Sequence, residues 1–330
     1  MTKPSILVAR AVAPSTIARL EQHFDVRSNQ ADEPWSCEQL IEALQGRQGF
    51  FSVGAERIDA ALLQACAQLR IVANMSVGFN NFDLEAMNRR RVVGTNAPGV
   101  LTETTADFGF ALLLATARRV TEAERYLRDG RWQRWEYGTL LGADVHGTTL
   151  GILGMGRIGQ AVARRGHFGF GMDVIYHNRT QLPEEVERHS GARYVSKEDL
   201  LRGADHLVLV LPYSASSHHA IGAAELALMK PTATLVNIAR GGIVDDAALA
   251  QALREGRIAA AGLDVYEGEP AVHPGLLSVP NIVLAPHIGS ATAATRLAMA
   301  NLAADNLVGF FHGKGPLNPV NPEVLSAVAS

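Results

Sequence analysis

Short runs of aliphatic and β-branched residues alternate with helix-length segments along almost the whole chain, and this alternation restricts the fold more than any other feature. The pattern is typical of parallel sheets with helical crossover connections, so we expect an α/β protein with two doubly wound parallel-sheet domains. In the second series the runs are nearly continuously apolar, as expected for a sheet buried on both faces. The first series covers residues 6–9, 24–27, 49–53, 70–73 and 92–95, and the second covers 148–154, 173–177, 192–195, 206–211, 234–238, 259–264 and 282–285.

The length of 330 residues also favours two domains. A helical apolar pattern over 102–118, with Thr102 as its predicted N-cap, separates the two series. A further helical segment over 291–311 is expected to pack back on the first domain. We therefore predict a discontinuous first domain of residues 1–99 and 291–330 and a second domain of residues 100–290. Residues of about 120–147 include Trp132 and Trp135 without a clean period, which indicates an arm or loop.

Composition and charge exclude several classes of function. Thirty basic residues against 33 acidic ones give a net charge of −3, which disfavours nucleic acid and anionic lipid as partners. Cys37 and Cys66 form no CxxC or Cys/His pattern, so we expect no disulfide, no metal site and a reducing, cytoplasmic setting. The longest apolar stretch, 108–117, is about half a membrane span, so a soluble protein with no membrane partner is expected.

A glycine-rich string follows the first strand of the second series. It matches G-x-G-x-x-G and consists of Gly154, Met155, Gly156, Arg157, Ile158 and Gly159. Because it lies between an apolar strand and the predicted helix 158–168, its amides are expected to face a pyrophosphate at the helix N-terminus. The second domain is thus predicted to be a Rossmann-type dinucleotide-binding domain; the alternative is a glycine-rich turn without a ligand.

The end of the next strand predicts which dinucleotide is bound. An acidic residue there would bind the ribose hydroxyls of NAD(H), whereas this chain has Asn178, Arg179 and Thr180. A guanidinium and a hydroxyl suit a 2′-phosphate, so NADP(H) is preferred over NAD(H). The alternative is that Arg179 is a solvated loop charge.

Three ionisable residues follow other strands of the second series. Arg240, Glu269 and His287 each come just after a predicted strand, where reacting groups of open α/β sheets lie. Arg240 can hold a 2-keto acid, His287 can donate or accept a proton, and Glu269 can orient the imidazole. This set suits hydride transfer with a nicotinamide, although each residue alone is more often structural. The pair His218-His219 is expected to lie on the surface without a chemical role.

In the first domain, a loop follows the strand 70–73. Small residues at Ser76 and Gly78 would expose backbone amides as an anion-binding nest for a substrate carboxylate. The alternative is an ordinary glycine turn.

Five ordered motifs give the chain an end-to-end resemblance to the D-isomer-specific 2-hydroxyacid dehydrogenases. They lie at residues 76–83, 151–159, 237–242, 262–270 and 286–290. Within this family the chain most resembles the bacterial glyoxylate/hydroxypyruvate reductases, which include 2-ketogluconate reductases. The resemblance implies NADPH-dependent reduction of a small 2-keto acid to the D-2-hydroxy acid.

The resemblance also implies an architecture and individual residue roles. It implies a homodimer with a dimerisation arm at about 120–147, and a Rossmann-type domain inserted into a flavodoxin-like substrate-binding domain, with the active site in the cleft between them. Arg240 is then the substrate clamp, His287 the acid/base and Glu269 its partner. The implied cofactor-binding residues, besides the glycine string and residues 178–180, are Thr105, Leu211, Pro212, Ile238, Ala239, Arg240, Asp264, His287, Gly289 and Ser290, and the substrate-binding residues are Met75, Val77, Gly78, Arg240 and His287.

Other functions remain open at this stage. One alternative is an NAD-linked dehydrogenase of the D-lactate type, which would need an acidic residue near Asn178. Another is a dehydrogenase of the phosphoglycerate type, which would need a further regulatory domain. A corepressor-like protein that only senses the dinucleotide has no need of Arg240, Glu269 and His287 together. The sequence does not rank glyoxylate, hydroxypyruvate and 2-keto-D-gluconate as substrates.

Overall fold

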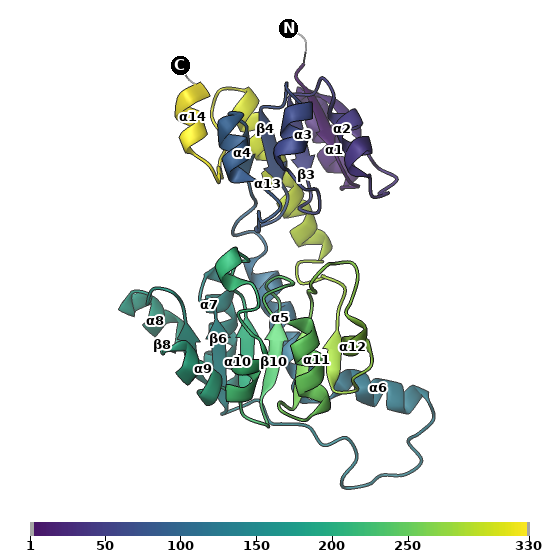
Figure 1. Ribbon diagram of the computed structural model, residues 1–330, viewed down its shortest axis with the longest axis vertical. Helices are drawn as coiled ribbons and strands as arrows, with labels where there is room; N and C mark the ends of the chain where they lie inside the picture. Colours follow the sequence, from purple (N-terminus) through teal and green to yellow (C-terminus); the bar gives the residue numbers. More distant parts are fainter. Residues whose placement is uncertain (1–2, 329–330) are drawn as a thin grey trace. The chain divides into compact units, whose positions relative to one another are not determined.

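The computed structural model describes residues 3–328 and divides the chain into two compact units (Figure 1). Unit 1 comprises Met1–Leu101 and Ala291–Ser330, and unit 2 comprises Thr102–Ser290. The first boundary therefore falls after Leu101, two residues beyond the predicted position.

Unit 1 is a five-stranded parallel sheet with helices on both faces. Its strand order, β2-β1-β3-β4-β5, is that of flavodoxin-like folds. Helices α1 and α13 pack together on one face, and the buried residues of α2, α3 and α4 form a core on the other. The strands are β1 (Ser5–Val8), β2 (Asp25–Ser28), β3 (Gly49–Ser52), β4 (Ile71–Asn74) and β5 (Val93–Thr95), and the helices are α1 (Pro14–His23), α2 (Cys37–Leu44), α3 (Ala60–Ala65), α4 (Leu84–Arg89), α13 (Ala293–Phe311) and α14 (Glu323–Val328).

The C-terminal segment joins unit 1 through buried polar contacts as well as through α13. The Asn321 side chain is fully buried; its oxygen accepts a hydrogen bond from the Gly94 amide at 2.8 Å, and its nitrogen donates to the carbonyl of Val92 at 3.0 Å. A buried amide side chain is costly unless it is hydrogen-bonded, so these bonds hold the segment before α14 against β5.

Unit 2 is a seven-stranded parallel sheet in the order β12-β11-β10-β9-β6-β7-β8. The order reverses between β6 and β9, which is the place where doubly wound sheets bind ligands. Helices α5 and α7 cover one face, and α9, α10, α11 and α12 cover the other. The strands are β6 (Thr149–Leu153), β7 (Asp173–His177), β8 (Ala192–Tyr194), β9 (His206–Leu209), β10 (Thr234–Asn237), β11 (Ala260–Leu263) and β12 (Ile282–Leu284), and the helices are α5 (Thr102–Ala117), α6 (Val120–Arg128), α7 (Arg157–Arg164), α8 (Glu184–Ser190), α9 (Lys197–Gly203), α10 (Ala223–Leu228), α11 (Asp246–Arg254) and α12 (Pro274–Leu277), with a π-helical turn at Arg165–Gly169 and a 3₁₀ turn at Ala215–Ser217.

The two-sheet α/β architecture predicted from the sequence is confirmed, but one local prediction was wrong and one helix was not predicted. Thr102 is the first residue of α5 rather than its N-cap. The predicted arm begins with helix α6, which Figure 1 shows extending beside the sheet of unit 2. None of its residues is buried, and its ion pairs, Arg119–Glu122 and Arg128–Glu124, join side chains one helical turn apart. Its apolar residues Val120, Ala123 and Leu127 recur at helical spacing, but they are not buried against the core of unit 2.

Among residues 3–328, no helix has the length and apolar character that a membrane span requires.

Candidate active site

The functional loops of unit 2 all start from one edge of its sheet. Leu209 pairs in register with Leu153 of β6 and with Asn237 of β10, and Asn237 pairs with Leu263 of β11. Leu263 in turn pairs with Leu284 of β12. Because the strands are parallel, the segments that follow these residues lie along the carboxyl edge of the sheet. That edge carries the glycine string and all three predicted catalytic residues.

The three glycines of the string play three different steric roles. Gly154 has a φ of +103°, and a Cβ there would lie 2.5 Å from the backbone nitrogen of Leu211. A Cβ on Gly159 would lie 2.4 Å from the carbonyl oxygen of Gly154. A Cβ on Gly156 would meet no atom within 4 Å. Gly154 therefore lets the turn after β6 approach the segment after β9, Gly159 lets α7 pack against that turn, and Gly156 leaves space beside the N-terminus of α7, where a pyrophosphate fits.

The loop after β7 is held in place by hydrogen bonds at both ends. The Asn178 side-chain oxygen accepts a hydrogen bond from the Met155 amide at 2.7 Å, and its carbonyl accepts one from the Tyr194 hydroxyl at 3.2 Å. The Leu182 amide donates to the buried Tyr176 hydroxyl at 2.8 Å. Burial, followed by the hydrogen bond to Glu187, raises the pKa of Tyr176 to about 12. Between these anchors Arg179 and Thr180 are exposed.

The contribution of both tyrosines was missed in the sequence. Tyr176 and Tyr194 occupy ordinary strand positions, and their contacts to the loop depend on how β7 and β8 pair. Asn178, moreover, fixes the glycine string, a contact that the strand-end motif did not predict.

A buried hydroxyl group on α5 is also suited to hydrogen-bond a bound nucleotide. Thr105 is 7% exposed, and its Oγ1 has no hydrogen-bond partner among the described residues. A Cβ built on Gly289 would lie 3.5 Å from Cγ2 of Thr105, so α5 and the loop after β12 meet there. A buried unpaired hydroxyl is costly, so a polar group of a bound cofactor would satisfy it. Together with the space at Gly156, this supports the fit of a dinucleotide.

The remaining predicted cofactor residues lie on loops of the same edge. Arg157 and Ile158 form the first turn of α7. The others follow strands, with Leu211 and Pro212 after β9, Ile238 and Ala239 after β10, and Ser290 after β12.

Glu269 and His287 are in direct contact. Nδ1 of His287 lies 2.8 Å from Oε2 of Glu269, although the two residues come from the loops after different strands. The His287 side chain is 48% exposed, and its Nε2 lies on the opposite side of the ring from the carboxylate. Burial alone would raise the pKa of Glu269, but the hydrogen bonds from His287 and from the Tyr266 amide outweigh it and hold the pKa below its ordinary value. The carboxylate therefore stays ionised at neutral pH and holds the imidazole through Nδ1.

Arg240 lies on the adjacent loop and is only partly exposed. Burial lowers the pKa of its guanidinium, and the charge of Glu269 opposes this. Its Nη1 donates to the carbonyl of Ala239 at 2.7 Å, and its own carbonyl accepts from the Asn237 side chain at 3.1 Å. The next residue allows the two loops to meet, because a Cβ on Gly241 would lie 1.6 Å from the carbonyl oxygen of Tyr266.

Asp264 holds the backbone on which His287 is carried. Its carbonyl accepts a hydrogen bond from the His287 amide at 2.9 Å, and its carboxylate oxygens accept from the Ile288 and Gly289 amides at 2.7 and 2.8 Å. His287 has a φ of +53°, a conformation that non-glycine residues rarely adopt. Burial raises the pKa of Asp264, and the two amides oppose that rise. Three consecutive hydrogen bonds thus stabilise an unfavourable backbone conformation at the predicted acid/base.

Tyr266 is a second supporting residue that sequence reasoning missed. It is buried; its amide donates to Oε1 of Glu269 at 2.9 Å, and its hydroxyl donates to the carbonyl of Ala285 at 2.8 Å. It therefore ties the loop of Glu269 to the segment that leads to His287. The sequence feature that could have identified Tyr266 is its position between Asp264 and Glu269 in one motif.

The predicted anion nest of unit 1 is a well-ordered loop. The Asn74 side chain donates to the Ser76 hydroxyl at 3.0 Å and to the Gly78 carbonyl at 2.9 Å, while the Val77 carbonyl accepts from the Asn96 side chain at 2.8 Å. Met75 is buried beside this loop. The use of the Val77 and Gly78 amides for a substrate carboxylate stays a prediction.

Comparison with known proteins shows the family. Residues 110–289 match the family D-isomer specific 2-hydroxyacid dehydrogenase, NAD binding domain. The chain is 47% identical to a glyoxylate reductase of Thermococcus onnurineus and 46% identical to a glyoxylate/hydroxypyruvate reductase B of Klebsiella pneumoniae, with at least 98% of each chain covered. It also resembles the crystal structure of an NADPH-dependent glyoxylate/hydroxypyruvate reductase from Sinorhizobium meliloti in complex with NADP and malonate, with a TM-score of 0.85, 37% identity and 97% of each chain covered. The chain therefore belongs to the family of D-isomer specific 2-hydroxyacid dehydrogenases.

Proposed function

We propose that this enzyme reduces small 2-keto acids to D-2-hydroxy acids with NADPH, and that glyoxylate and hydroxypyruvate are its substrates. The observation that carries this proposal is the 2.8 Å contact between His287 and Glu269 on the sheet edge that also carries Arg240 and the glycine string. A proton donor, a cation and a dinucleotide cradle on one edge are the parts that ketone reduction requires.

Each side chain has one task in this reaction. A bound nicotinamide supplies the hydride that adds to the keto carbon. Arg240 binds the 2-keto acid through its planar guanidinium and polarises the carbonyl. His287 donates the proton from Nε2 to the carbonyl oxygen, and Glu269 orients the imidazole through its contact with Nδ1. In the reverse direction the same imidazole accepts the hydroxyl proton.

The relatives support the choice of substrate. Those at 46–47% identity over nearly the full length carry the names glyoxylate reductase and glyoxylate/hydroxypyruvate reductase. 2-Keto-D-gluconate, a larger 2-keto acid, is the third substrate to be tested.

The preference for NADPH rests on the anchored loop after β7. Asn178, which ends the strand motif, carries no charge, and Arg179 makes no ion pair with any described carboxylate. The bonds at Asn178 and Leu182 hold the segment between them, so Arg179 and Thr180 are presented on an ordered loop. Hydrogen bonds from a guanidinium to a phosphate contribute about 1.5–3 kcal/mol each, which is roughly tenfold to hundredfold per contact.

The proposal is tested by steady-state kinetics with three 2-keto acids and both cofactors. We expect measurable reduction of glyoxylate and hydroxypyruvate and a higher kcat/KM for NADPH than for NADH. The double variant Asn178→Asp, Arg179→Ile should reverse the cofactor preference, because a carboxylate accepts the ribose hydroxyls and repels the phosphate. Arg188→Ile, a change of an exposed arginine on α8, is the matched control.

The outcomes separate the two parts of the proposal. If the wild type prefers NADH, or if the double variant leaves the ratio unchanged, the NADPH assignment is wrong while the reductase assignment stands. Absence of reduction of all three acids with either cofactor would refute the reductase assignment itself.

We further propose that two copies of the chain associate through the segment that contains α6 and the residues after it. This segment exposes large apolar side chains, with Trp132 54%, Trp135 78% and Tyr137 85% exposed. Exposed apolar groups of this size mark interaction surfaces. Light scattering after size exclusion should give twice the mass of the 35.3 kDa chain, and the double change Trp132→Ser, Trp135→Ser should give the single mass. A single mass for the wild type would refute a homodimer.

A further inference from the structure

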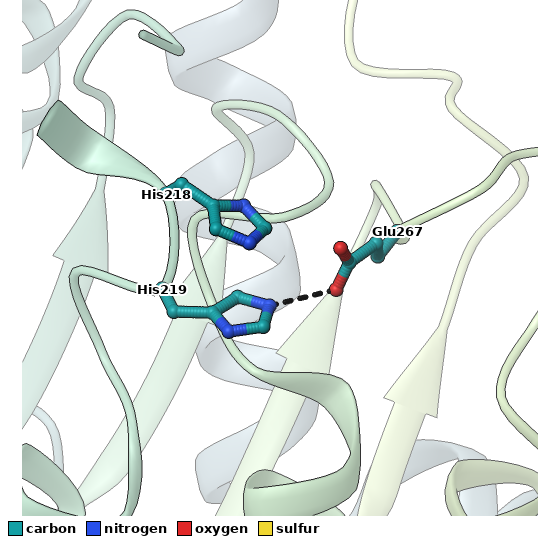
Figure 2. A group of neighbouring side chains, drawn as sticks. All are labelled: His218, His219 and Glu267. Atoms are coloured by element: carbon teal, nitrogen blue, oxygen red, sulfur yellow. Dashed lines mark hydrogen bonds and ion pairs between the residues drawn. The ribbon is translucent and has the colours of Figure 1, made fainter. Parts of the chain in front are cut away.

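A second cluster of chemically active side chains lies outside the residues assigned so far. His218 and His219 follow the 3₁₀ turn Ala215–Ser217, and Glu267 lies in the loop after β11 (Figure 2). One nitrogen of each imidazole and one carboxylate oxygen all lie within 4.8 Å of one another. Two neutral imidazoles and a carboxylate form a donor set that is typical of zinc and related ions.

The contact between His219 and Glu267 has nearly the spacing that a shared ion would impose. Nε2 of His219 lies 2.8 Å from Oε2 of Glu267. Zinc binds imidazole nitrogen and carboxylate oxygen at about 2.0–2.2 Å, so tetrahedral geometry separates two such donors by about 3.3 Å. A displacement of about half an ångström therefore admits an ion between them. Both side chains are partly exposed, so this movement is sterically easy.

Polar groups lie near the second nitrogen of each imidazole. Nδ1 of His219 lies 3.8 Å from a carboxylate oxygen of Asp245, a distance at which the two are close but not hydrogen-bonded. Nδ1 of His218 lies 3.2 Å from the Tyr213 hydroxyl, so Nε2 is the nitrogen left for an ion. Partners on the second ring nitrogen fix ligand orientation and raise its basicity. The His219 amide also donates to the Gly242 carbonyl at 2.7 Å, and its φ of +49° is an uncommon backbone conformation for histidine.

The two rings are stacked, with centroids 3.9 Å apart and an interplanar angle of 23°. Because an imidazole lone pair lies in the ring plane, one ring must tilt for both to bind the same ion. His218 is exposed, and its ring can turn about its side-chain torsions into that position.

We propose that His218, His219 and Glu267 bind one divalent transition-metal ion of the zinc class. The site is separate from Arg240, Glu269 and His287, but it lies beside the loops of the first two. The His219 amide donates to Gly242 in the loop of Arg240, and Glu267 lies two residues before Glu269. This proposal departs from the expectation that the protein binds no metal and that the histidine pair has no chemical role.

The experiment measures Zn²⁺ binding to the full-length protein after treatment with a chelator, by competition with a chromophoric chelator. The Cys37→Ser background is used throughout, because the exposed thiol of Cys37 is an alternative zinc ligand. We expect one ion per chain, with Mg²⁺ failing to compete because it prefers oxygen ligands. X-ray absorption of the bound zinc should show imidazole ligands.

Variants assign the ion to this cluster. His219→Ala and Glu267→Gln should each lower the affinity at least about tenfold, since loss of a mere supporting contact already costs 10–100-fold. The controls are His189→Ala and Glu185→Gln, exposed residues of the same types on α8, and they should retain the affinity. Circular dichroism verifies that every variant is folded. The proposal is overturned if the wild-type protein binds no zinc, or if both cluster variants bind zinc as tightly as the wild type and the controls do.

Discussion

Gly241→Ala is expected to impair catalysis through a backbone clash rather than by removing a reacting group. The added Cβ would lie 1.6 Å from the carbonyl oxygen of Tyr266, 2.1 Å from its carbonyl carbon and 2.7 Å from the nitrogen of Glu267. All three are backbone atoms, so no side-chain rotation relieves the contact. Restoring an acceptable separation of 3.0 Å from the oxygen requires a movement of at least about 1.4 Å between the two loops.

This movement separates Arg240 from Glu269 and His287. Misplacing a reacting group by about 1 Å costs on the order of 10²-fold, so kcat/KM for glyoxylate should fall by about 10²-fold or more. The binding of NADPH should change less than kcat/KM, because the glycine string follows a different strand, although Ile238 and Ala239 beside Gly241 are predicted to contact the cofactor. Overpacking of this kind typically destabilises by about 1–3 kcal/mol, which lowers Tm by about 2–4 °C per kcal/mol in a domain of this size.

The assay compares kcat/KM for glyoxylate with the Kd for NADPH from nucleotide fluorescence, below the Tm of each variant. Gly169→Ala is the matched control, because its added Cβ would meet nothing within 4 Å. Wild-type kcat/KM in the Gly241 variant would refute the argument that this close backbone approach positions the two loops. A parallel loss of NADPH binding would also contradict it, because the damage would then extend beyond the loops.

Three further predictions concern the loops at the same edge. His287→Asn should lower kcat by about 10²–10⁴-fold while the Kd for NADPH stays within a few-fold, and near-wild-type turnover at neutral pH would exclude His287 as the acid/base. Because the pKa of Glu269 is depressed in the folded state, its ionised form stabilises the fold above about pH 4.3, and that contribution is lost as the pH falls through the lower folded value. The difference in unfolding free energy between wild type and Glu269→Gln, from urea titrations, should thus be present at pH 5 and shrink below about pH 4; an unchanged difference from pH 5 down to pH 3 would contradict the depressed pKa of Glu269 and its hydrogen bonds. Asp264→Asn leaves one of the Ile288 and Gly289 amides without an acceptor and should cost about 1–3 kcal/mol, and an unchanged thermal transition would show that neither bond matters.

The sequence predicted the sheets and the glycine string well because both depend on neighbouring residues. Apolar runs such as β7 (Asp173–His177) have the predicted bounds, since the pattern that predicts a strand extends over only a few residues. The position of Arg240, Glu269 and His287 after parallel strands was also enough to place them at one sheet edge. Helix α6 was missed although Val120, Ala123 and Leu127 recur at helical spacing, because the segment is only nine residues long and none of its residues is buried in the core.

Only the tertiary structure decided how the loops at that edge hold one another. Asp264 bonds the Ile288 and Gly289 amides across 24 and 25 residues of sequence, and the Asn178 side chain bonds the Met155 amide across 23. The closeness of Gly241 to Tyr266, and of His219 to Glu267, likewise joins loops that follow different strands. Such contacts depend on the register of parallel strands and on side-chain rotamers, and no local pattern in the sequence encodes either. The sequence alone therefore determined which residues reach the edge, and the packing of the sheet determined which of them touch.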